Sequence, residues 1–211
     1  MEQEIKKISQ KVIPRLSRYY RILFEHIGGD IVSSKELADI SGYTAAQVRK
    51  DLGYFGQFGC PGRGYNIDEL KSSIRRILGL DRKWNVALVG VGNLGMALLG
   101  YKGFKEQGFD IVAAFDNDPA KLGKIIKGVE IFHSDVMCTV MVQRKIDMAI
   151  LTVPRESAQA IAEEAVRCGA KAVLNFAPIN LKLPATVKVR NIDMSIEIEN
   201  LSFLISKQAE A

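Results

Sequence analysis

The sequence predicts an α/β protein in which a small helical domain precedes a parallel sheet covered by helices, with one further helix at the end. Two observations carry this prediction. Over residues 81–192, short runs of apolar and β-branched residues alternate with stretches of helical periodicity, which is the pattern of repeated βα units. Over residues 1–80, apolar residues recur mainly at helical spacing. We therefore expect domains over 1–80 and 81–192 and a separate C-terminal helix over 193–211.

The composition is that of an ordinary globular protein. The chain has 211 residues, of which 47% are hydrophobic and 25% are charged, which suffices for one large domain or two small ones. No apolar run reaches the roughly 18 residues of a transmembrane helix. The N-terminus carries acids and lysines and no apolar core, so no signal peptide is expected. We therefore expect a cytoplasmic protein.

The positive charge is concentrated in the N-terminal part of the chain. Residues 1–82 hold 14 Lys and Arg against 10 Asp and Glu, a net charge of +4, whereas residues 83–211 hold 15 against 14, a net charge of +1. This asymmetry is compatible with nucleic-acid binding by the N-terminal domain, and also with an ordinary solvated surface.

The cysteines and histidines do not form a metal-binding pattern. Cys60, Cys138 and Cys168 are far apart in the sequence and form no Cys-x-x-Cys pair, and the only histidines are His26 and His133. We therefore expect neither a disulfide framework nor a metal site, in keeping with a reducing compartment. An alternative is that one cysteine senses redox state, and Cys60 is then the first to test.

The first helical stretch runs from Ile5 to Ile27. Pro14 interrupts its apolar pattern, so we expect one helix to end just before this residue and a second to begin at or near it. Gly28 and Gly29 stop the second helix. Three arginines lie on or beside its exposed side: Arg15, Arg18 and Arg21.

Two short helices with matching start signals follow. Ser33 to Glu36 and Thr44 to Gln47 both have the sequence of a capping box, and Gly42 lies between them. Two capped helices joined by a short turn that contains glycine predict a helix-turn-helix.

The second of these helices, expected over Ala45 to Phe55, has a face suited to the major groove of DNA. At 100° per residue, Ala45, Val48, Leu52 and Phe55 fall on one side and should be core. The opposite side gathers an amide, a cation, a small residue and a tyrosine, which are side chains that can contact base edges. The candidate DNA-binding residues on this helix are Ala46, Gln47, Arg49, Lys50 and Tyr54. The alternative is an ordinary amphipathic surface helix.

A glycine-rich stretch after this helix predicts the wing of a winged helix-turn-helix. Between Phe58 and Tyr65 stand three glycines and one proline, which is typical of a hairpin tip. Arg63 at the tip, like Arg15 on the earlier helix, is a candidate DNA contact. An amphipathic helix over Ile67–Leu80 then leads into a linker over Gly79–Trp84. This linker is short, is apolar at both ends and is not a flexible tether of the Gly/Ser type.

The centre of the chain predicts a Rossmann domain. A strand that ends at Val89 runs into Gly-x-Gly-x-x-Gly, and a helix is expected over Leu94–Gln107. The three glycines of this motif allow a tight turn, close approach of a pyrophosphate and close packing of the helix on the strand. The candidate cofactor-binding residues are Gly90, Val91, Gly92, Asn93, Leu94 and Gly95.

An acidic residue stands where such a domain binds ribose. The next apolar run ends in Asp116, 21 residues after Gly95. A carboxylate there can bind ribose hydroxyls and repel a 2′-phosphate, which favours NAD and NADH. Asp118 competes for this role. The alternative is a phosphate-free βαβ unit whose turn happens to be rich in glycine.

Further βα units complete a doubly wound parallel sheet. Strands are expected over Asp147–Leu151, Lys171–Asn175 and, at the edge, Val187–Arg190, with helices over Ser134–Arg144 and Arg155–Gly169. Ligands of such sheets bind beyond the carboxyl ends of the strands. This adds candidate cofactor-binding residues: Thr152, Val153, Pro154, Phe176, Ala177, Pro178 and, from the first helix, Tyr101.

The last segment predicts a helix with two apolar sides. Met194, Ile198, Leu201 and Ile205 share one face, and Phe203 lies nearly opposite. Such a helix needs two partners. A homodimer in which the helix is swapped into the other subunit is the simplest arrangement.

Five collinear motifs resemble one known family over nearly the whole chain. They are Tyr19-Tyr-Arg21-Ile-Leu, Gln47-Val-Arg-Lys-Asp51-Leu-Gly-Tyr-Phe-Gly56, Gly90-Val-Gly-Asn-Leu-Gly95, Thr152-Val-Pro-Arg155 and Asn175-Phe-Ala-Pro178. In these the chain resembles the bacterial redox-sensing repressors of the Rex family. The resemblance implies a homodimer that binds an inverted-repeat operator, senses the NADH/NAD ratio and leaves DNA when NADH binds. It also implies that Arg21, Tyr101 and Asp193 meet between domains and subunits as parts of the switch.

Two other functions fit a Rossmann domain less well. A dehydrogenase needs a proton donor or acceptor beside the nicotinamide and space for a substrate domain, and the only histidine after the glycine motif is His133, in an early loop. The region after Thr152 also resembles CoA-binding Rossmann domains, but no histidine stands where a phosphohistidine enzyme needs one. We expect no catalytic residues.

Overall fold

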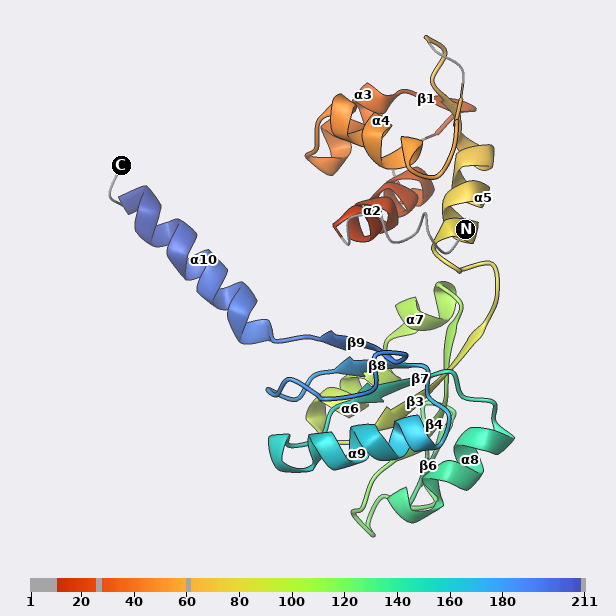
Figure 1. Cartoon of the computed structure of the whole chain (residues 1–211), viewed down its shortest axis with the longest axis vertical. Helices are drawn as coiled ribbons and strands as arrows, with labels where there is room; N and C mark the ends of the chain where they lie inside the picture. The colour runs from red at the N-terminus through yellow and green to blue at the C-terminus, as the bar shows by residue number, and fades with distance from the viewer. Residues whose placement is uncertain (1–10, 26–27, 60–61, 210–211) are drawn as a thin grey trace. The chain divides into compact units, whose positions relative to one another are not determined.

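The computed structural model describes residues 11–25, 28–59 and 62–209. The chain divides into two compact units, the first of which ends at Arg82 and the second of which begins at Lys83 (Figure 1). Each unit has a hydrophobic core of its own. The finer division into functional segments over 1–80, 81–192 and 193–211 stays a prediction.

The first unit is a helix-turn-helix with a small antiparallel ribbon. Its elements are α2 (Val12–Glu25), β1 (Ile31–Val32), α3 (Ser34–Ser41), α4 (Ala45–Gly53), β2 (Tyr65–Asn66) and α5 (Ile67–Ile77). Pro14 lies in the first turn of α2, where its missing N–H costs nothing. The strand after the glycine-rich stretch, β2, pairs with β1, with Ile31 opposite Asn66. Gly62 and Arg63 form the turn before it, and the Cys60 prediction lies outside the described residues.

One of the two expected capping boxes is complete. The Ser33 side chain accepts a hydrogen bond from the backbone N–H of Glu36, and the Glu36 carboxylate accepts one from the backbone N–H of Ser33. Thr44 likewise accepts from the N–H of Gln47, but the Gln47 amide donates to Asp51 instead of closing the box. The second capping box was therefore a wrong prediction, because a buried carboxylate is the stronger partner for this amide.

Among the described residues of the first unit, Asp51 is the one charged side chain in the core. Its side chain is fully buried and accepts hydrogen bonds from the Arg15 guanidinium at 2.7 Å, the Gln47 amide at 2.7 Å and the Tyr19 hydroxyl at 3.0 Å. Burial by itself raises the pKa of the Asp51 carboxyl, but these hydrogen bonds more than offset it and hold the pKa below its ordinary value. Asp51 thus joins α2 to α4, and Val48 and Leu52 of α4 face the same core, as predicted.

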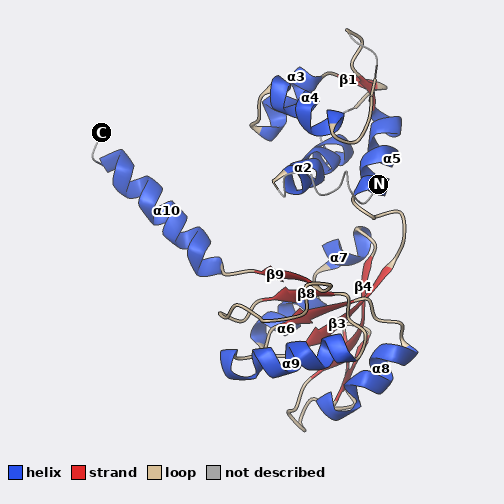
Figure 2. Cartoon of the chain, viewed as in Figure 1, coloured by secondary structure: helices blue, strands red, loops and turns tan. Residues whose placement is uncertain are grey.

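The second unit is a doubly wound sheet (Figure 2). Its strands lie in the order β5-β6-β4-β3-β7-β8-β9, and every neighbouring pair is parallel except β5 with β6. The strands are β3 (Trp84–Val89), β4 (Phe109–Phe115), β5 (Ile125–Ile126), β6 (Val129–Phe132), β7 (Met148–Leu151), β8 (Ala172–Asn175) and β9 (Lys188–Asn191). The expected edge strand over Val187–Arg190 is confirmed as β9.

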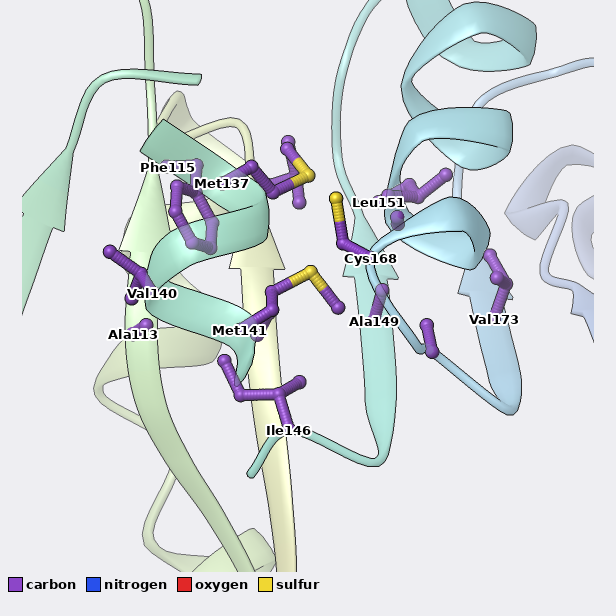
Figure 3. Packing of buried hydrophobic residues seen from close by; sticks show 14 of the residues in the cluster. Ala113, Phe115, Met137, Val140, Met141, Ile146, Ala149, Leu151, Cys168 and Val173 are labelled. Atoms are coloured by element: carbon purple, nitrogen blue, oxygen red, sulfur yellow. The ribbon is translucent and has the colours of Figure 1, made fainter. Parts of the chain in front are cut away.

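Alternate residues of these strands enter two hydrophobic clusters, one on each face of the sheet. Ala87, Val89 and Phe115 pack with α8 (Met137–Gln143) and α9 (Arg155–Arg167), as Figure 3 shows in part. Val86, Leu88 and Ala114 belong to the other cluster, with Leu98, Leu99 and Phe104 of α6 (Asn93–Leu99) and α7 (Lys102–Glu106). This alternation is what buries a parallel sheet on both sides.

The single helix expected over Leu94–Gln107 was wrong. It is two helices, α6 and α7, that meet at Gly100 and Tyr101. The N–H of Gly100 caps the carbonyl groups at the end of α6, and Tyr101 adopts an extended conformation with φ −80° and ψ 104°. Gly100 itself keeps a right-handed helical conformation, with φ −83° and ψ −9°, so the break lies at the extended backbone of Tyr101, which is the N-cap of α7. Similarly, the helix expected over Ser134–Arg144 begins as a 3₁₀ turn, η1 (Ser134–Val136).

The expectation that no disulfide forms was also wrong. Cys138, near the start of α8, is bonded to Cys168, which caps the end of α9. The two Cα atoms are 4.5 Å apart, although 30 residues separate them in the sequence. Spacing along the chain could not reveal this, because the two residues meet only when both helices pack on the same face of the sheet.

The last helix, α10 (Met194–Ala209), is exposed over residues 194–207. Residues 194–207 are all solvent-accessible, and seven of them are large apolar side chains that are 51–68% exposed: Met194, Ile196, Ile198, Leu201, Phe203, Leu204 and Ile205. Asp193 begins the helix, because its carboxylate accepts a hydrogen bond from the N–H of Ser195 at 2.9 Å. None of the described helices has the length and apolarity needed to cross a bilayer.

The buried position of Asp51 leads to a stability prediction. Asp51→Ala should lower the free energy of unfolding of the first unit by about 2–4 kcal/mol, because it leaves the Tyr19 hydroxyl and the Arg15 guanidinium without their partner. Asp39→Ala, at an exposed position of α3, is the matched control and should change it by less than about 0.5 kcal/mol. Urea unfolding followed by far-ultraviolet circular dichroism measures both.

The contribution of Asp51 to the free energy of unfolding should depend on pH. Because the pKa of Asp51 is lowered in the folded state, its stabilising contribution is present above the pKa of the unfolded chain and is lost as the pH falls through the folded value. The difference between the native chain and Asp51→Ala should therefore shrink in acid. A difference that stays constant down to the lowest accessible pH would contradict the assignment.

Candidate dinucleotide site and DNA-binding surface

A cavity of about 490 Å³ opens at the carboxyl ends of β3, β4 and β7, where a parallel sheet of this type binds its ligands. Its walls combine a glycine turn, an acid, a lysine and small hydroxyl side chains. The lining residues are Val89, Gly90, Gly92, Phe115, Asp116, Asn117, Lys121, Ser134, Thr152, Val153, Pro154, Ser157 and Ile161.

The three glycines have three different surroundings. Gly90 has a φ of +92°, and a Cβ there would lie 2.7 Å from the carbonyl oxygen of Thr152. A Cβ on Gly95 would collide with the carbonyl oxygen of Gly90. A Cβ on Gly92, by contrast, would meet no heavy atom within 4 Å. Gly90 and Gly95 are thus required by the fold, whereas the open space beside Gly92 is where a ligand can approach the backbone.

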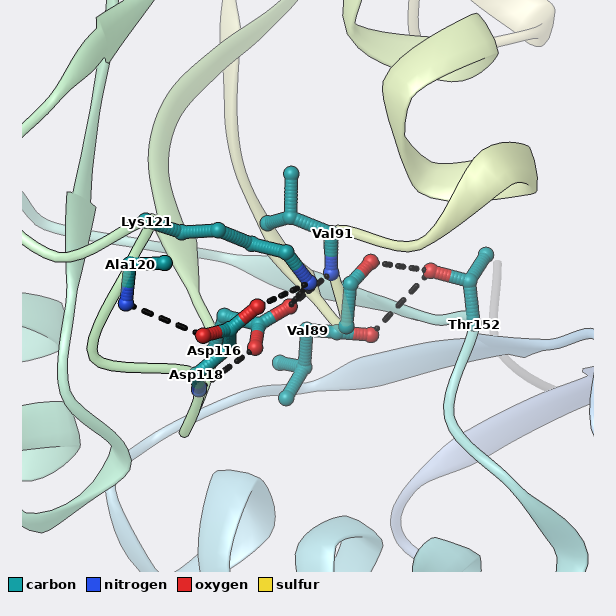
Figure 4. A network of polar contacts seen from close by, with 8 residues as sticks. Val89, Val91, Asp116, Asp118, Ala120, Lys121 and Thr152 are labelled. Atoms are coloured by element: carbon teal, nitrogen blue, oxygen red, sulfur yellow. Dashed lines mark hydrogen bonds and ion pairs between the residues drawn. The ribbon is translucent and has the colours of Figure 1, made fainter.

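Asp116 holds this turn in place (Figure 4). One carboxylate oxygen accepts the N–H of Val91 at 2.7 Å and the Lys121 ammonium at 3.1 Å, and the other accepts the N–H of Asp118 at 2.8 Å. Burial raises the pKa of the Asp116 carboxyl, but these donors outweigh it and keep the pKa below its ordinary value. Asp116 is therefore ionised at neutral pH.

Lys121 lines the cavity, although it is not among the site residues predicted from the sequence. Its ammonium lies 3.1 Å from Asp116 and 3.6 Å from Asp118, and the hydrogen bond to Asp116 raises its pKa above the ordinary value. Asp118, the competitor for the ribose role, is 47% exposed in its side chain and does not line the cavity. The only indication of this role in the sequence is that a lysine stands five residues after Asp116. The turn at residues 119–123 decides whether its side chain points toward Asp116.

The second wall of the cavity follows β7. The Thr152 hydroxyl donates to the carbonyl oxygen of Gly90 at 2.6 Å, which ties this wall to the glycine turn, and Val153 and Pro154 line the cavity as predicted. Ser134 and Ser157 also line it, although sequence reasoning did not select them.

Other predicted cofactor residues lie outside the cavity wall. Val91 contributes its N–H to Asp116, and Asn93, Leu94 and Gly95 begin α6. The turn after β8 is shaped by the fully buried Asn175, whose amide bonds both the N–H and the carbonyl of Ala177. Three further residues do not line the cavity and keep their role as a prediction only: Phe176, Ala177 and Pro178. Tyr101 is 55% exposed and lines a separate hollow with Phe104.

The polar side of α4 is exposed as predicted, but not all of its side chains are free to contact DNA. Ala46, Arg49, Lys50 and Tyr54 are exposed, and Thr44 starts the helix. Arg49 donates to the Ser34 hydroxyl at 3.0 Å. Gln47 is engaged with Asp51, as is Arg15, whose side chain remains 17% exposed. Arg63 lies exposed in its turn. The predicted DNA-binding surface thus consists of exposed side chains of α4, and the buried Asp51 beneath them binds Gln47 and Arg15.

A helix-turn-helix joined to a glycine-turn parallel sheet defines a two-domain transcription regulator. Two family models match in agreement with this: one described as a putative DNA-binding protein N-terminus over residues 7–53, and one described as a CoA binding domain over residues 81–179. The chain is 44% identical over 208 residues to the redox-sensing transcriptional repressor Rex of Pelotomaculum thermopropionicum, covering 97% of this chain and 98% of that protein. It is also 44% identical over 204 residues to Rex of Clostridioides difficile, with 96% and 97% coverage. The chain belongs to the Rex family of redox-sensing transcriptional repressors.

Solved structures agree over the whole chain. A Rex-family repressor named RSP, in complex with NAD+ and operator DNA, has a TM-score of 0.91 and 39% identity, covering 96% of this chain and 94% of that one. RSP in complex with NADH has a TM-score of 0.86 and 37% identity, with 96% coverage of both chains. The relatives are named as repressors, so the chain is a regulator rather than an enzyme.

The different surroundings of two glycines give a prediction about the cavity. Gly92→Ala should leave thermal unfolding within about 2 °C of the native chain, because its φ of −80° suits alanine and no atom opposes the new methyl group. The methyl should nevertheless weaken NADH binding at least tenfold, because it enters the space of the pyrophosphate. Fluorescence titration with NADH measures the affinity.

Gly95→Ala is the matched control. Its methyl would meet the Gly90 carbonyl, so this variant should unfold at a clearly lower temperature even without ligand. If Gly92→Ala bound NADH as tightly as the native chain, the cavity would not be the dinucleotide site.

Proposed function

We propose that this repressor binds NAD and NADH in the cavity at the carboxyl ends of β3, β4 and β7, and that NADH releases it from inverted-repeat operator DNA. The observation that carries the proposal is the open space at Gly92 beside the ionised Asp116, with Gly90 and Gly95 packed against Thr152. RSP, which is 37–39% identical, was solved with NAD+ and operator DNA and with NADH, and this supports the same ligands here.

Asp116 sets the expected preference for NAD(H) over NADP(H), but with Lys121 as its counter-ion. A carboxylate that accepts N–H groups on one side can accept ribose hydroxyls on the other, and it repels a 2′-phosphate. The nearby Lys121 ammonium reduces this repulsion. We therefore infer a preference for NADH over NADPH that is smaller than an isolated aspartate would produce.

Helix α4 is the proposed reader of the operator, with Lys50 at its centre. A lysine can bond guanine O6 and N7, and the Ala46 methyl can contact a thymine methyl. Gln47 must exchange Asp51 for a base if it is to read adenine. Arg15, Arg49, Tyr54 and Arg63 are proposed to contact phosphates or, for Arg63, the minor groove.

The exposed apolar helix α10 supports a homodimer. A helix with seven large apolar side chains in solvent is a partner-binding element, and its two apolar sides fit insertion into a second subunit as a swapped helix. A symmetric dimer also matches an inverted-repeat operator. Binding to the bacterial chromosome places the protein in the cytoplasm.

The proposed switch links Arg21 of α2 with Asp193 at the start of α10, with Tyr101 close to them. Arg21 and Tyr101 are exposed, as a contact with another domain or subunit requires. An ion pair that forms in only one state of the dimer would favour that state, and NADH would then alter the spacing of the two α4 helices.

Release from DNA tests the proposed function directly. The full chain bound to an inverted-repeat operator should be released by NADH at concentrations where NAD has no effect, in a gel-shift titration of each dinucleotide. Equal release by both would disprove the redox sensor, and release by neither would disprove the coupling of the two units.

Lys50 provides a prediction about operator reading. Lys50→Ala should weaken operator binding by about 1–3 kcal/mol if Lys50 bonds a guanine, and the preference for the operator over unrelated DNA should fall with it. If Lys50 contacts only phosphate, the loss of affinity should be the same for all DNA sequences. The slope of log affinity against log salt concentration should then fall by about one. Lys35→Ala, at an exposed position of α3, is the control. Unchanged affinity would exclude Lys50 from the interface.

Asp193 provides a prediction about the switch. Asp193→Ala removes the charge and also the helix cap at Ser195, whereas Asp193→Asn keeps a capping oxygen and removes only the charge. Both variants should require a different NADH concentration for release, by about threefold or more, if the ion pair is part of the switch. A change in Asp193→Ala alone would show that capping, not the pair, matters.

A further inference from the structure

The disulfide between Cys138 and Cys168 joins α8 to the C-terminal end of α9 and has no part in the functions proposed above. The Cα atoms are 4.5 Å apart, inside the range that an unstrained bridge needs. Cys168 is 6% exposed, and Cys138 is partly buried against the same hydrophobic cluster. Figure 3 shows the Cys168 sulfur directed toward the side of α8 where Met137 lies.

The bridge closes a loop that contains one wall of the cavity. Residues 138–168 include most of α8 and all of β7 and α9, and therefore five of the residues that line the cavity: Thr152, Val153, Pro154, Ser157 and Ile161. Ser134, on the other side of the cavity, lies four residues before Cys138. The bond thus fixes η1 and α8 against α9 at the helix end remote from the cavity.

A carboxylate stands beside both sulfur atoms. Glu164 Oε1 lies 3.5 Å from the Sγ of Cys138 and 3.4 Å from the Sγ of Cys168, and Glu164 Oε2 is paired with Arg167. When the bond is reduced, each thiol can donate its S–H to Oε1, so the reduced form has a hydrogen-bond partner ready in the same place. Both redox forms therefore fit this site.

A permanent structural bridge is not expected in a DNA-binding repressor, because the compartment that holds the DNA keeps thiols reduced and disulfides there are mostly transient or regulatory. We propose that Cys138 and Cys168 form a reversible thiol–disulfide pair that responds to hydroperoxides and gives this repressor a second redox input.

The chemistry balances with a hydroperoxide as the oxidant. The thiolate sulfur of the more accessible Cys138 attacks the terminal oxygen of the hydroperoxide and forms a sulfenic acid as the O–O bond breaks. The leaving group is hydroxide from hydrogen peroxide, or an alkoxide from an organic hydroperoxide, and it takes a proton to become water or an alcohol. The Cys168 thiolate then attacks the sulfenic sulfur, the S–S bond forms and hydroxide leaves as water. The two sulfurs are oxidised by two electrons in total, and the peroxide is reduced. Exchange with an external dithiol restores both thiols.

The same three residues could instead hold a metal ion, since their ligand atoms lie within 4.8 Å of one another. We favour the disulfide because protein zinc sites that serve structure have four protein ligands, and Cys138, Glu164 and Cys168 supply three. Zinc binding is made one outcome of the test.

The test uses the full chain with Cys60→Ser, so that only two thiols remain. Treatment with hydrogen peroxide should remove both thiols together from alkylation, lower the intact mass by two hydrogens and raise the melting temperature of the second unit by about 5–10 °C. Dithiothreitol should reverse all three changes. Adding Cys138→Ser or, separately, Cys168→Ser should abolish the rise in melting temperature.

Three results would overturn the proposal. They are thiols that stay reactive under excess peroxide, oxygen addition at each cysteine without loss of two hydrogens, and one Zn²⁺ per reduced chain that survives gel filtration and blocks both thiols. Cys138→Ser, at the more exposed position, keeps the test valid should Cys168→Ser fail to fold.

An effect of the Cys138–Cys168 redox state on NADH binding rests on the proposed function, in which the cavity is the dinucleotide site. Because the bridge restrains α8 against α9, which carries the lining residues Ser157 and Ile161, the oxidised chain should bind NADH several-fold more tightly than the reduced chain. Equal affinity in both forms would overturn the coupling while the thiol pair stands. Absence of NADH binding in both forms would instead show that the proposed dinucleotide site is wrong.

Discussion

The second unit depends on the hydrogen bond from the N–H of Val91 to the Asp116 carboxylate. It joins the glycine turn after β3 to the end of β4, two strands that are adjacent in the sheet. With this bond in place, Gly90 can turn with a positive φ, Gly95 packs on the Gly90 carbonyl, and the Thr152 hydroxyl closes the third side from β7. Of the three glycines of the motif, Gly92 alone has open space where a Cβ would lie, and it lines the cavity. The ligand site is therefore a consequence of how three strand ends are held together.

Asp51 and Asp116 have similar roles in the two units, because each carboxylate accepts several hydrogen bonds that hold neighbouring segments together. Asp51 is a buried carboxylate that fixes the position of the second helix of the helix-turn-helix, by accepting hydrogen bonds from α2 and from α4 itself. Both carboxylates have pKa values held below the ordinary range by their donors. In each unit, a charged acceptor inside the fold orients exposed groups that are suited to bind a polyanion or a phosphate.

Much of this could be predicted because it depends on local patterns. The alternation of apolar residues predicts the strands and their two faces, and the glycine motif with Asp116 predicts the cavity and its main wall. What could not be predicted depends on contacts between distant segments. Asp51 looks like one more polar residue of α4 until α2 covers it, and Lys121 acquires its role only from the turn after Asp116. Cys138 and Cys168 meet through the packing of two helices on one sheet face.

Two further features could not be predicted from the sequence: the break between α6 and α7, and the partner that covers α10. The sequence predicts one helix over Leu94–Gln107, but the backbone is extended at Tyr101 and a second helix begins after it. In the single chain, α10 leaves its large apolar side chains exposed on both of its apolar sides. Which partner covers them is a property of an assembly, and periodicity within one chain can only suggest it.

The central claim is that the dinucleotide cavity and the DNA-binding surface are thermodynamically coupled. It is tested most directly by measuring the Kd of NADH by calorimetry for the full chain, alone and saturated with operator DNA. Linkage requires that DNA weaken NADH binding by the same factor by which NADH weakens DNA binding. The account predicts equal factors, well above one. An NADH affinity that operator DNA leaves unchanged would contradict it.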